Sequence, residues 1–179
     1  MATARPRSAR TVAVAAGILT SALLLTGCGA IIDSITGPSE AQRDEPGGEV
    51  TAASDADVFS LQVGDCVNES APVETEETVE YDSLPVVPCA DPHTGEVYAE
   101  HELPAGDFPG DQAVSDTGME HCYSVFEEFV GLSYEESTLE FWAMFPTQQS
   151  WDVADDRTVQ CFVGPVEDTV TGTLAGAAV

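Results

Sequence analysis

The chain has 179 residues, a formal net charge of −27 and no lysine, with 32 acidic residues against five arginines. This charge excludes nucleic-acid binding through phosphate neutralisation, and anionic lipid head groups should repel the chain. It favours solubility and basic or cationic partners. The hydrophobic content of 43% is enough for a single core of modest size.

The first 27 residues are typical of a bacterial secretory signal. Three arginines precede any acidic residue, and no residue of the segment 11–26 is charged. A basic start, a short apolar region and small residues at its end mark such signals. The apolar region is shorter than the roughly 20 residues that a membrane-spanning helix needs. An uncleaved N-terminal membrane anchor is the alternative interpretation.

Cys28 ends this segment in the run LLLTGC at 23–28. The run resembles the lipobox of bacterial lipoproteins. That resemblance implies that the Cys28 sulfur receives a diacylglyceryl group and that Cys28 becomes the first residue of the mature protein. Two or more acyl chains give stable anchoring, whereas a single chain is marginal. We therefore expect a lipoprotein that is held on the extracytoplasmic face of the cell membrane.

Composition divides the remaining chain into three parts. Residues 28–57 are rich in Gly, Ser, Pro and acidic residues and lack any hydrophobic period, which predicts a disordered acidic linker. Residues 58–165 hold enough apolar residues for one folded domain. Residues 166–179 thin to Thr, Gly and Ala, which predicts a flexible tail.

The domain begins with two short predicted strands, at 59–67 and 85–89, on either side of an exposed acidic loop. The clearest strand is 96–103, where apolar and polar residues alternate. This alternation predicts that Val97, Ala99, His101 and Leu103 face the core, whereas Glu96, Tyr98, Glu100 and Glu102 face solvent. Segments 139–145 and 158–163 are rich in β-branched and aromatic residues and predict two further strands.

One helix is predicted over 111–130, because apolar residues recur there at helical spacing and Gly131 suits a left-handed cap. The expected fold class is α+β. It comprises a small antiparallel sheet of four to six strands with one main helix packed on a face.

The four cysteines after Cys28 all fall inside the predicted domain: Cys66, Cys89, Cys122 and Cys161. In an exported chain an even set indicates two disulfides, and four cysteines allow three connectivities. We favour Cys66–Cys89, which would close the acidic loop, and Cys122–Cys161, which would join the helix to the last strand. Zinc binding needs closely spaced ligand pairs, which are absent here.

Several short segments of the predicted domain form an ordered set. They are VGDCV at 63–67, VPCADPHTGEVYA at 87–99, FPG at 108–110, Cys122 with Phe126 and FVG at 129–131, FPT at 145–147 with Ser150-Trp151, and DRTVQC at 156–161. In order and spacing they resemble the septum-formation domain of actinobacterial lipoproteins and membrane-anchored proteins. The resemblance implies an extracytoplasmic, disulfide-bearing domain connected with cell division, and it supplies no catalytic residue.

His93 is the first candidate functional residue, because it lies between Asp91 and Glu96 ahead of the clearest strand. As a general base it would need an oriented partner and a nucleophile within reach, and no hydrolase motif accompanies it. We favour a turn in which the imidazole bonds to the backbone near Cys89.

Trp151 and Arg157 are the other candidates, in the segment WDVADDR at 151–157. The aspartates lack the spacing of an EF-hand loop. We expect a hairpin turn, with Trp151 covering the edge of the core and Arg157 paired to a nearby carboxylate.

Together these features predict a tethered module that binds or scaffolds an envelope protein or a wall component, with no cofactor and no metal. The alternatives are a small wall-modifying hydrolase that uses His93 with nearby acids, and a sensor module.

Overall fold

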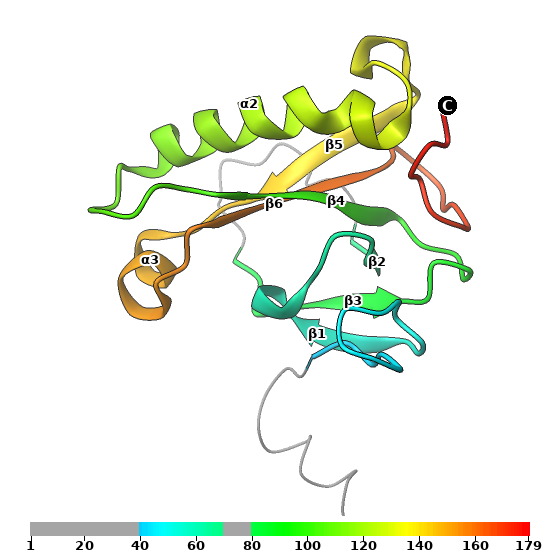
Figure 1. Ribbon diagram of the computed structural model, residues 1–179, viewed down its shortest axis with the longest axis horizontal. Helices are drawn as coiled ribbons and strands as arrows, with labels where there is room; N and C mark the ends of the chain where they lie inside the picture. The colour runs from blue at the N-terminus through cyan, green and yellow to red at the C-terminus, as the bar shows by residue number, and fades with distance from the viewer. Residues whose placement is uncertain (1–39, 70–79) are drawn as a thin grey trace, which may run out of the picture.

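Residues 40–69 and 80–179 are described by a computed structural model of the chain (Figure 1). The proposed signal, Cys28 and the acidic stretch 70–79 lie outside the described residues. None of the helices in the described part is long and apolar enough to cross a membrane.

The fold is built on a six-stranded sheet in which every pairing is antiparallel. The strand order is β1-β3-β2-β4-β6-β5. The strands are β1 (Ser54–Asp57), β2 (Cys66–Val67), β3 (Ser83–Val87), β4 (Gly95–Glu102), β5 (Leu139–Met144) and β6 (Thr158–Pro165). The predicted α+β class with an antiparallel sheet of four to six strands is confirmed.

Helix α2 (Asp111–Val130) packs on one face of the sheet, as the sequence predicts (Figure 1). Its buried residues recur every fourth position, which places them on one side of the helix: Val114, Gly118, Cys122, Phe126 and Val130. A Cβ atom at Gly118 would lie 2.8 Å from the Phe145 ring, so the absent side chain lets helix and sheet approach closely. Gly131 ends the helix with φ 85°.

The sheet has a hydrophobic core on each face. One core lies beneath α2 and includes Phe126, Tyr98 and Val163. The other lies between strands β1–β3 and strands β4–β6, and includes Phe162, which stacks against Trp142 with ring centroids 5.7 Å apart. Because the sheet curls back on itself in this way, β1 and β3 lie on the side away from α2 (Figure 1).

Strand β4 departs from the predicted alternation at a β-bulge. Its register with β6 moves from Val97↔Phe162 to Ala99↔Cys161, so Tyr98 is the extra residue. Tyr98 was predicted on the solvent face but is buried beneath α2, where its hydroxyl donates to the Cys122 carbonyl at 2.7 Å. Glu96, also predicted to be exposed, is buried as well, because the chain after β6 covers this half of the strand.

The ordered fold extends beyond the domain limits of 58 and 165 that composition predicts. On the N-terminal side, Arg43 and Val50 form a β-bridge and β1 pairs with β3. On the C-terminal side, Val170 forms a bridge with His93, and Leu174 is buried in the core beneath α2. Individual contacts therefore order segments whose average composition is typical of a linker or a tail.

The segment around Trp151 forms a short helix, α3 (Gln148–Ala154), so the predicted hairpin turn is wrong. Thr147 begins the helix with a capping box, in which its hydroxyl accepts from the Ser150 N–H and the Ser150 hydroxyl accepts from the Thr147 N–H. Asp155 ends it in the left-handed conformation with φ 55°. The cap at Thr147 is the local signal that favours a helix over a turn.

Candidate functional site

The two favoured disulfides are both present. Cys66–Cys89 joins β2 to the chain just after β3, with Cα atoms 5.2 Å apart. Cys122–Cys161 joins α2 to β6, with Cα atoms 5.6 Å apart. The predicted connectivity is confirmed, and none of these four sulfurs remains as a thiol.

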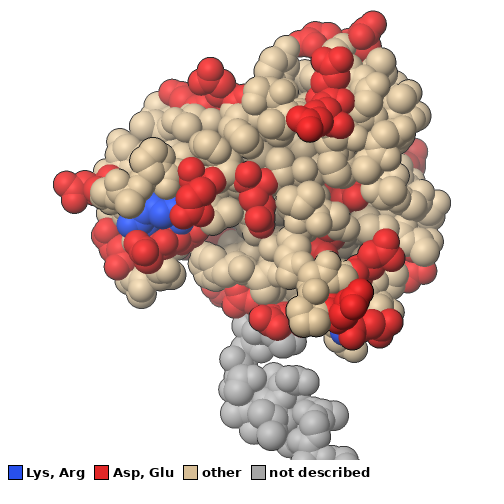
Figure 2. All heavy atoms as spheres, in the orientation of Figure 1, with Lys and Arg blue, Asp and Glu red and all other residues tan. Residues whose placement is uncertain are grey.

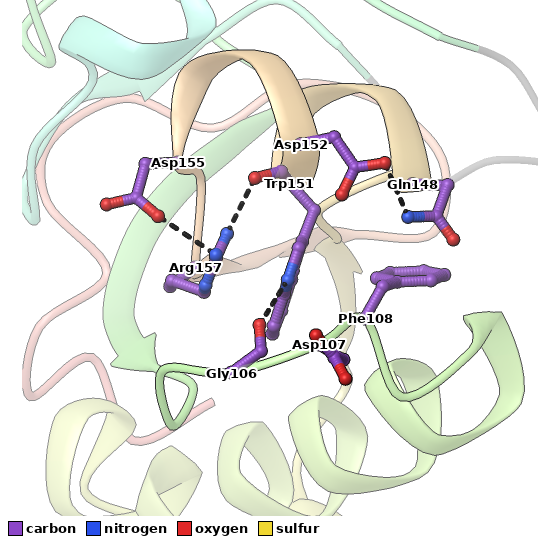
Figure 3. Close-up of a pocket in the computed structure, with 8 residues that line it drawn as sticks. All are labelled: Gly106, Asp107, Phe108, Gln148, Trp151, Asp152, Asp155 and Arg157. Carbon is purple, nitrogen blue, oxygen red and sulfur yellow. Dashed lines mark hydrogen bonds and ion pairs between the residues drawn. The ribbon is translucent and has the colours of Figure 1, made fainter.

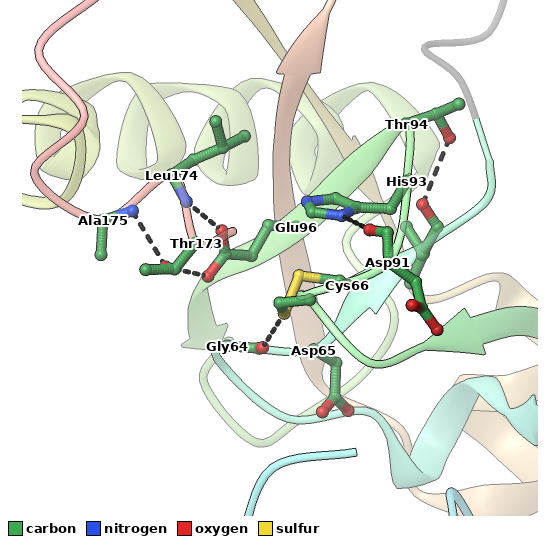
Figure 4. Close-up of a disulfide and its surroundings, with 12 residues drawn as sticks. Gly64, Asp65, Cys66, Asp91, His93, Thr94, Glu96, Thr173, Leu174 and Ala175 are labelled. Atoms are coloured by element: carbon green, nitrogen blue, oxygen red, sulfur yellow. Dashed lines mark hydrogen bonds between the residues drawn. A yellow bond between two sulfur atoms is a disulfide. The ribbon is translucent and has the colours of Figure 1, made fainter. Parts of the chain in front are cut away.

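His93 is enclosed by the backbone around it (Figure 4). Its ring is fully buried, and Nδ1 lies 2.9 Å from the Asp91 carbonyl oxygen. Its backbone exchanges two hydrogen bonds with Val170, each 2.9 Å long. The predicted backbone contact of the imidazole is confirmed. A general base must reach the proton that it removes, and this ring is closed off from any substrate outside the domain.

Glu96 lies beside His93 and the Cys66–Cys89 disulfide (Figure 4), and the sequence did not single it out. Its carboxylate accepts from the Leu174 N–H at 2.5 Å and from the Thr173 hydroxyl at 2.7 Å. Burial raises the pKa of Glu96, while these hydrogen bonds and the nearby His93 act in the opposite direction. The sulfurs of Cys66 and Cys89 are bonded to each other, so the group of Cys66, Cys89 and Glu96 is structural. The hydrogen bonds of Glu96 to Thr173 and Leu174 hold the C-terminal segment against β4, and we call this contact the clasp at Glu96.

Trp151 and Arg157 form one wall of a surface pocket (Figure 3). The Arg157 guanidinium lies 3.7 Å from the centroid of the Trp151 ring, a cation–π contact. It also donates to the Trp151 carbonyl at 3.0 Å and pairs with Asp155 at 2.9 Å. The predicted ion pair is confirmed, but its acidic partner is 92% exposed, so it is a surface pair of small energetic weight.

The remaining lining of this pocket is acidic and aromatic. Phe108 meets the Trp151 ring edge to face at 5.4 Å, and the carboxylates of Asp107 and Asp152 lie at the rim (Figure 3). Trp151 itself is buried and donates its indole N–H to the Gly106 carbonyl at 2.9 Å. This tryptophan therefore covers the edge of the core as predicted. The positive charge in the pocket comes from Arg157, which lines it.

Arg43 is the other arginine in the described part of the chain. The sequence did not indicate its structural role, because it lies in the predicted linker. It holds Asp65 through both carboxylate oxygens, at 2.7 and 2.5 Å. The side chains are only 10% and 2% exposed. Asp65 also accepts from the Gln62 N–H at 2.9 Å. The pair fastens the N-terminal segment to the loop before β2.

The surface that results is strongly acidic. Figure 2 shows carboxylates spread over the visible face, with blue atoms confined to two small places. Within the described ranges the basic side chains are Arg43 and Arg157, and each is paired with an aspartate. The acidic charge on the outside of the domain is therefore left without internal compensation.

Comparison with known proteins identifies the family. The septum-formation family ("Septum formation") matches residues 28–173, which is most of the chain. Neither a curated protein nor a solved structure matches the chain. The ordered motifs of the sequence, the α+β domain and the two disulfides agree with that match. The chain belongs to the septum-formation family, which links it to septum formation at the cell envelope.

Proposed function

We propose that this protein is a lipid-anchored, extracytoplasmic module that binds a basic partner in the cell envelope and so takes part in septum formation. The proposal places the lipid on Cys28 and the domain outside the membrane. Two features support this placement. The family match begins at Cys28. The domain also contains two disulfides, which form and persist mainly in exported proteins.

The observation that carries the binding role is the uncompensated acidic surface. Arg43 and Arg157 are engaged by Asp65 and Asp155, so the other exposed carboxylates of the described part have no arginine paired with them. Such a field attracts basic partners and speeds their encounter with the domain. The lipid would keep the domain close to the membrane while its own charge keeps it off anionic head groups.

The alternative of a small wall-modifying hydrolase has no support in the geometry of His93. The ring is buried and bonded to the backbone, and the neighbouring carboxylate of Glu96 accepts hydrogen bonds from Thr173 and Leu174. Hydrolysis needs an acid, a base or a nucleophile that opens to a substrate cleft. A binding role needs only the surface.

The proposal can be tested in the cells that encode the chain, by immunofluorescence of the untagged protein and by fractionation. We expect the wild type in the membrane fraction and enriched at septa, and Cys28→Ser lost from both. A Cys28→Ser protein that stays membrane-bound would contradict the anchor. Even distribution of the wild type around the envelope, together with normal septa after deletion of the gene, would contradict the role in division.

A further inference from the structure

Strand β5 ends the sheet and pairs only with β6 within the described part of the chain. A terminal strand leaves alternate backbone N–H and C=O groups free to pair with another extended segment. Six residues of β5 are paired to β6 in regular register, from Leu139 to Met144. The pairing therefore has no bulge, and the opposite edge of β5 is long enough to receive a short partner strand.

Three aromatic side chains gather beside this edge from three different elements. They are Tyr123 from α2, Tyr134 from the turn of 3-10 helix η2 (Tyr134–Glu136) and Phe141 from β5. Tyr134 lies 4.9 Å from Phe141 and 6.1 Å from Tyr123, measured between ring centroids. Tyr123 is 49% exposed, so part of this cluster faces solvent rather than the core.

Carboxylates border the same cluster. The Tyr123 hydroxyl donates to Glu135, and the Tyr134 hydroxyl donates to Glu140 of β5. The hydrogen bond to Glu140 raises the pKa of Tyr134 to about 12, so the Tyr134 hydroxyl remains a hydrogen-bond donor. Both arginines of the described part are paired elsewhere, with Asp65 and Asp155. In Figure 2 red atoms gather where η2 projects, with no blue beside them.

We propose that the β5 edge surface, defined as the free edge of β5 with Tyr123, Tyr134, Glu135 and Glu140, binds an extended basic segment of a partner protein as a seventh strand. Main-chain hydrogen bonds to β5 would supply affinity, as in other cases of strand addition. Lysine or arginine side chains of the partner would meet the tyrosine rings and the two carboxylates. At ~3.4 Å per residue, β5 accommodates about six partner residues.

A second copy of this chain is a poorer occupant. Pairing of two β5 edges would bring Glu140 of one copy towards acidic residues of the other, and like charges placed opposite each other in a sheet are destabilising. The chain has no lysine to offset them. Charge complementarity therefore selects a basic segment from a different protein.

This inference rests on the proposed function, and one binding experiment separates the two. The intact chain in nonionic detergent is titrated into a labelled eight-residue peptide of alternating threonine and lysine, and anisotropy is recorded at low and moderate salt. A second peptide has the same sequence but is N-methylated at two adjacent central residues. Whichever side of its backbone faces β5 then carries a methyl group, while its charge is unchanged.

We expect the unmethylated peptide to bind at least about tenfold more tightly than the methylated one, a difference of about 1.4 kcal/mol. Methylation both removes main-chain hydrogen bonds and adds a steric clash. Glu135→Gln with Glu140→Gln should weaken binding several-fold, because these amides keep the hydrogen bonds from tyrosine and remove only the charge. Asp107→Asn with Asp152→Asn at the Trp151 pocket is the matched control, because it also removes two charges, and it should have little effect.

Equal binding of the two peptides, with equal losses in the β5 and pocket variants, would overturn the β5 edge surface and leave general acidic binding intact. Absence of binding by either peptide at low salt would overturn the basic-partner proposal itself. Thermal unfolding of each variant checks that the fold is retained.

Discussion

The Cys122–Cys161 disulfide offers the sharpest test of what holds this small domain together. It joins α2 to strand β6, and both cysteines are fully buried. The two residues are 39 positions apart, and in the chain-entropy treatment closing such a loop stabilises the fold by about 4 kcal/mol. Domains of this size have total stabilities of roughly 5–15 kcal/mol, so this contribution is a large share.

The perturbation is the double substitution Cys122→Ala with Cys161→Ala, measured by urea unfolding with tryptophan fluorescence and near-ultraviolet circular dichroism. We expect the free energy of unfolding to fall by about 4 kcal/mol. The pair Cys66→Ala with Cys89→Ala is the comparison: its cysteines are 23 positions apart, and the expected loss is about 3.5 kcal/mol. A loss below about 1 kcal/mol in the α2–β6 variant would refute this reasoning, because the helix would then be held by packing alone.

Three further changes test individual contacts. Gly164→Ala should destabilise the domain by about 3 kcal/mol or prevent folding, because its Cβ would lie 2.1 Å from the Thr94 carbonyl oxygen. Thermal unfolding measures this loss, and an unchanged melting temperature would refute the close approach. Arg43→Met should cost about 3–5 kcal/mol by leaving the Asp65 carboxylate buried and unpaired, and additional Asp65→Asn should recover part of that loss in urea unfolding. Because burial raises the folded-state pKa of Glu96, its ionisation costs stability as pH rises above its unfolded value of about 4.5. The stability of Glu96→Gln relative to wild type should therefore increase as pH rises above about 4.5, and a pH-independent difference would count against this.

Local patterns in the sequence were sufficient to predict the elements that depend on interactions between residues close in the chain. Helix α2 has a buried face of fourfold spacing and a glycine that ends it, and the structure keeps both of its predicted bounds. The disulfide pairing followed from the order of cysteines and predicted elements, and both bridges formed as expected. The family motifs, read in order, also agreed with the later match over residues 28–173.

Features that depend on distant contacts were not visible in the sequence. The bulge at Tyr98 reverses the alternation of β4, and it becomes apparent only when β4 is paired with β6. The clasp at Glu96 needs the chain near Leu174, 78 positions away. Arg43 finds Asp65 across 22 positions, inside a segment whose composition resembles a linker. In each case the local structure depends on a contact with residues that are distant in the sequence.

The β5 edge surface was also beyond local patterns, because its aromatic residues come from α2, η2 and β5. Tyr123 and Phe141 are 18 positions apart but meet at 6.4 Å between ring centroids. Their convergence depends on how α2 packs over the sheet. The sequence alone shows only that the chain has no lysine, and so none that could neutralise this surface.

If this domain works outside the membrane on a lipid tether at Cys28, the mature N-terminus must begin at Cys28 and carry that lipid. After denaturation, trypsin should cut after Arg43 and release residues 28–43, which contain no other arginine and no lysine. Mass spectrometry of that peptide from native membranes should show Cys28 as its first residue, carrying a diacylglyceryl group. A peptide that begins before Cys28, or an unmodified Cys28 sulfur, would contradict the account.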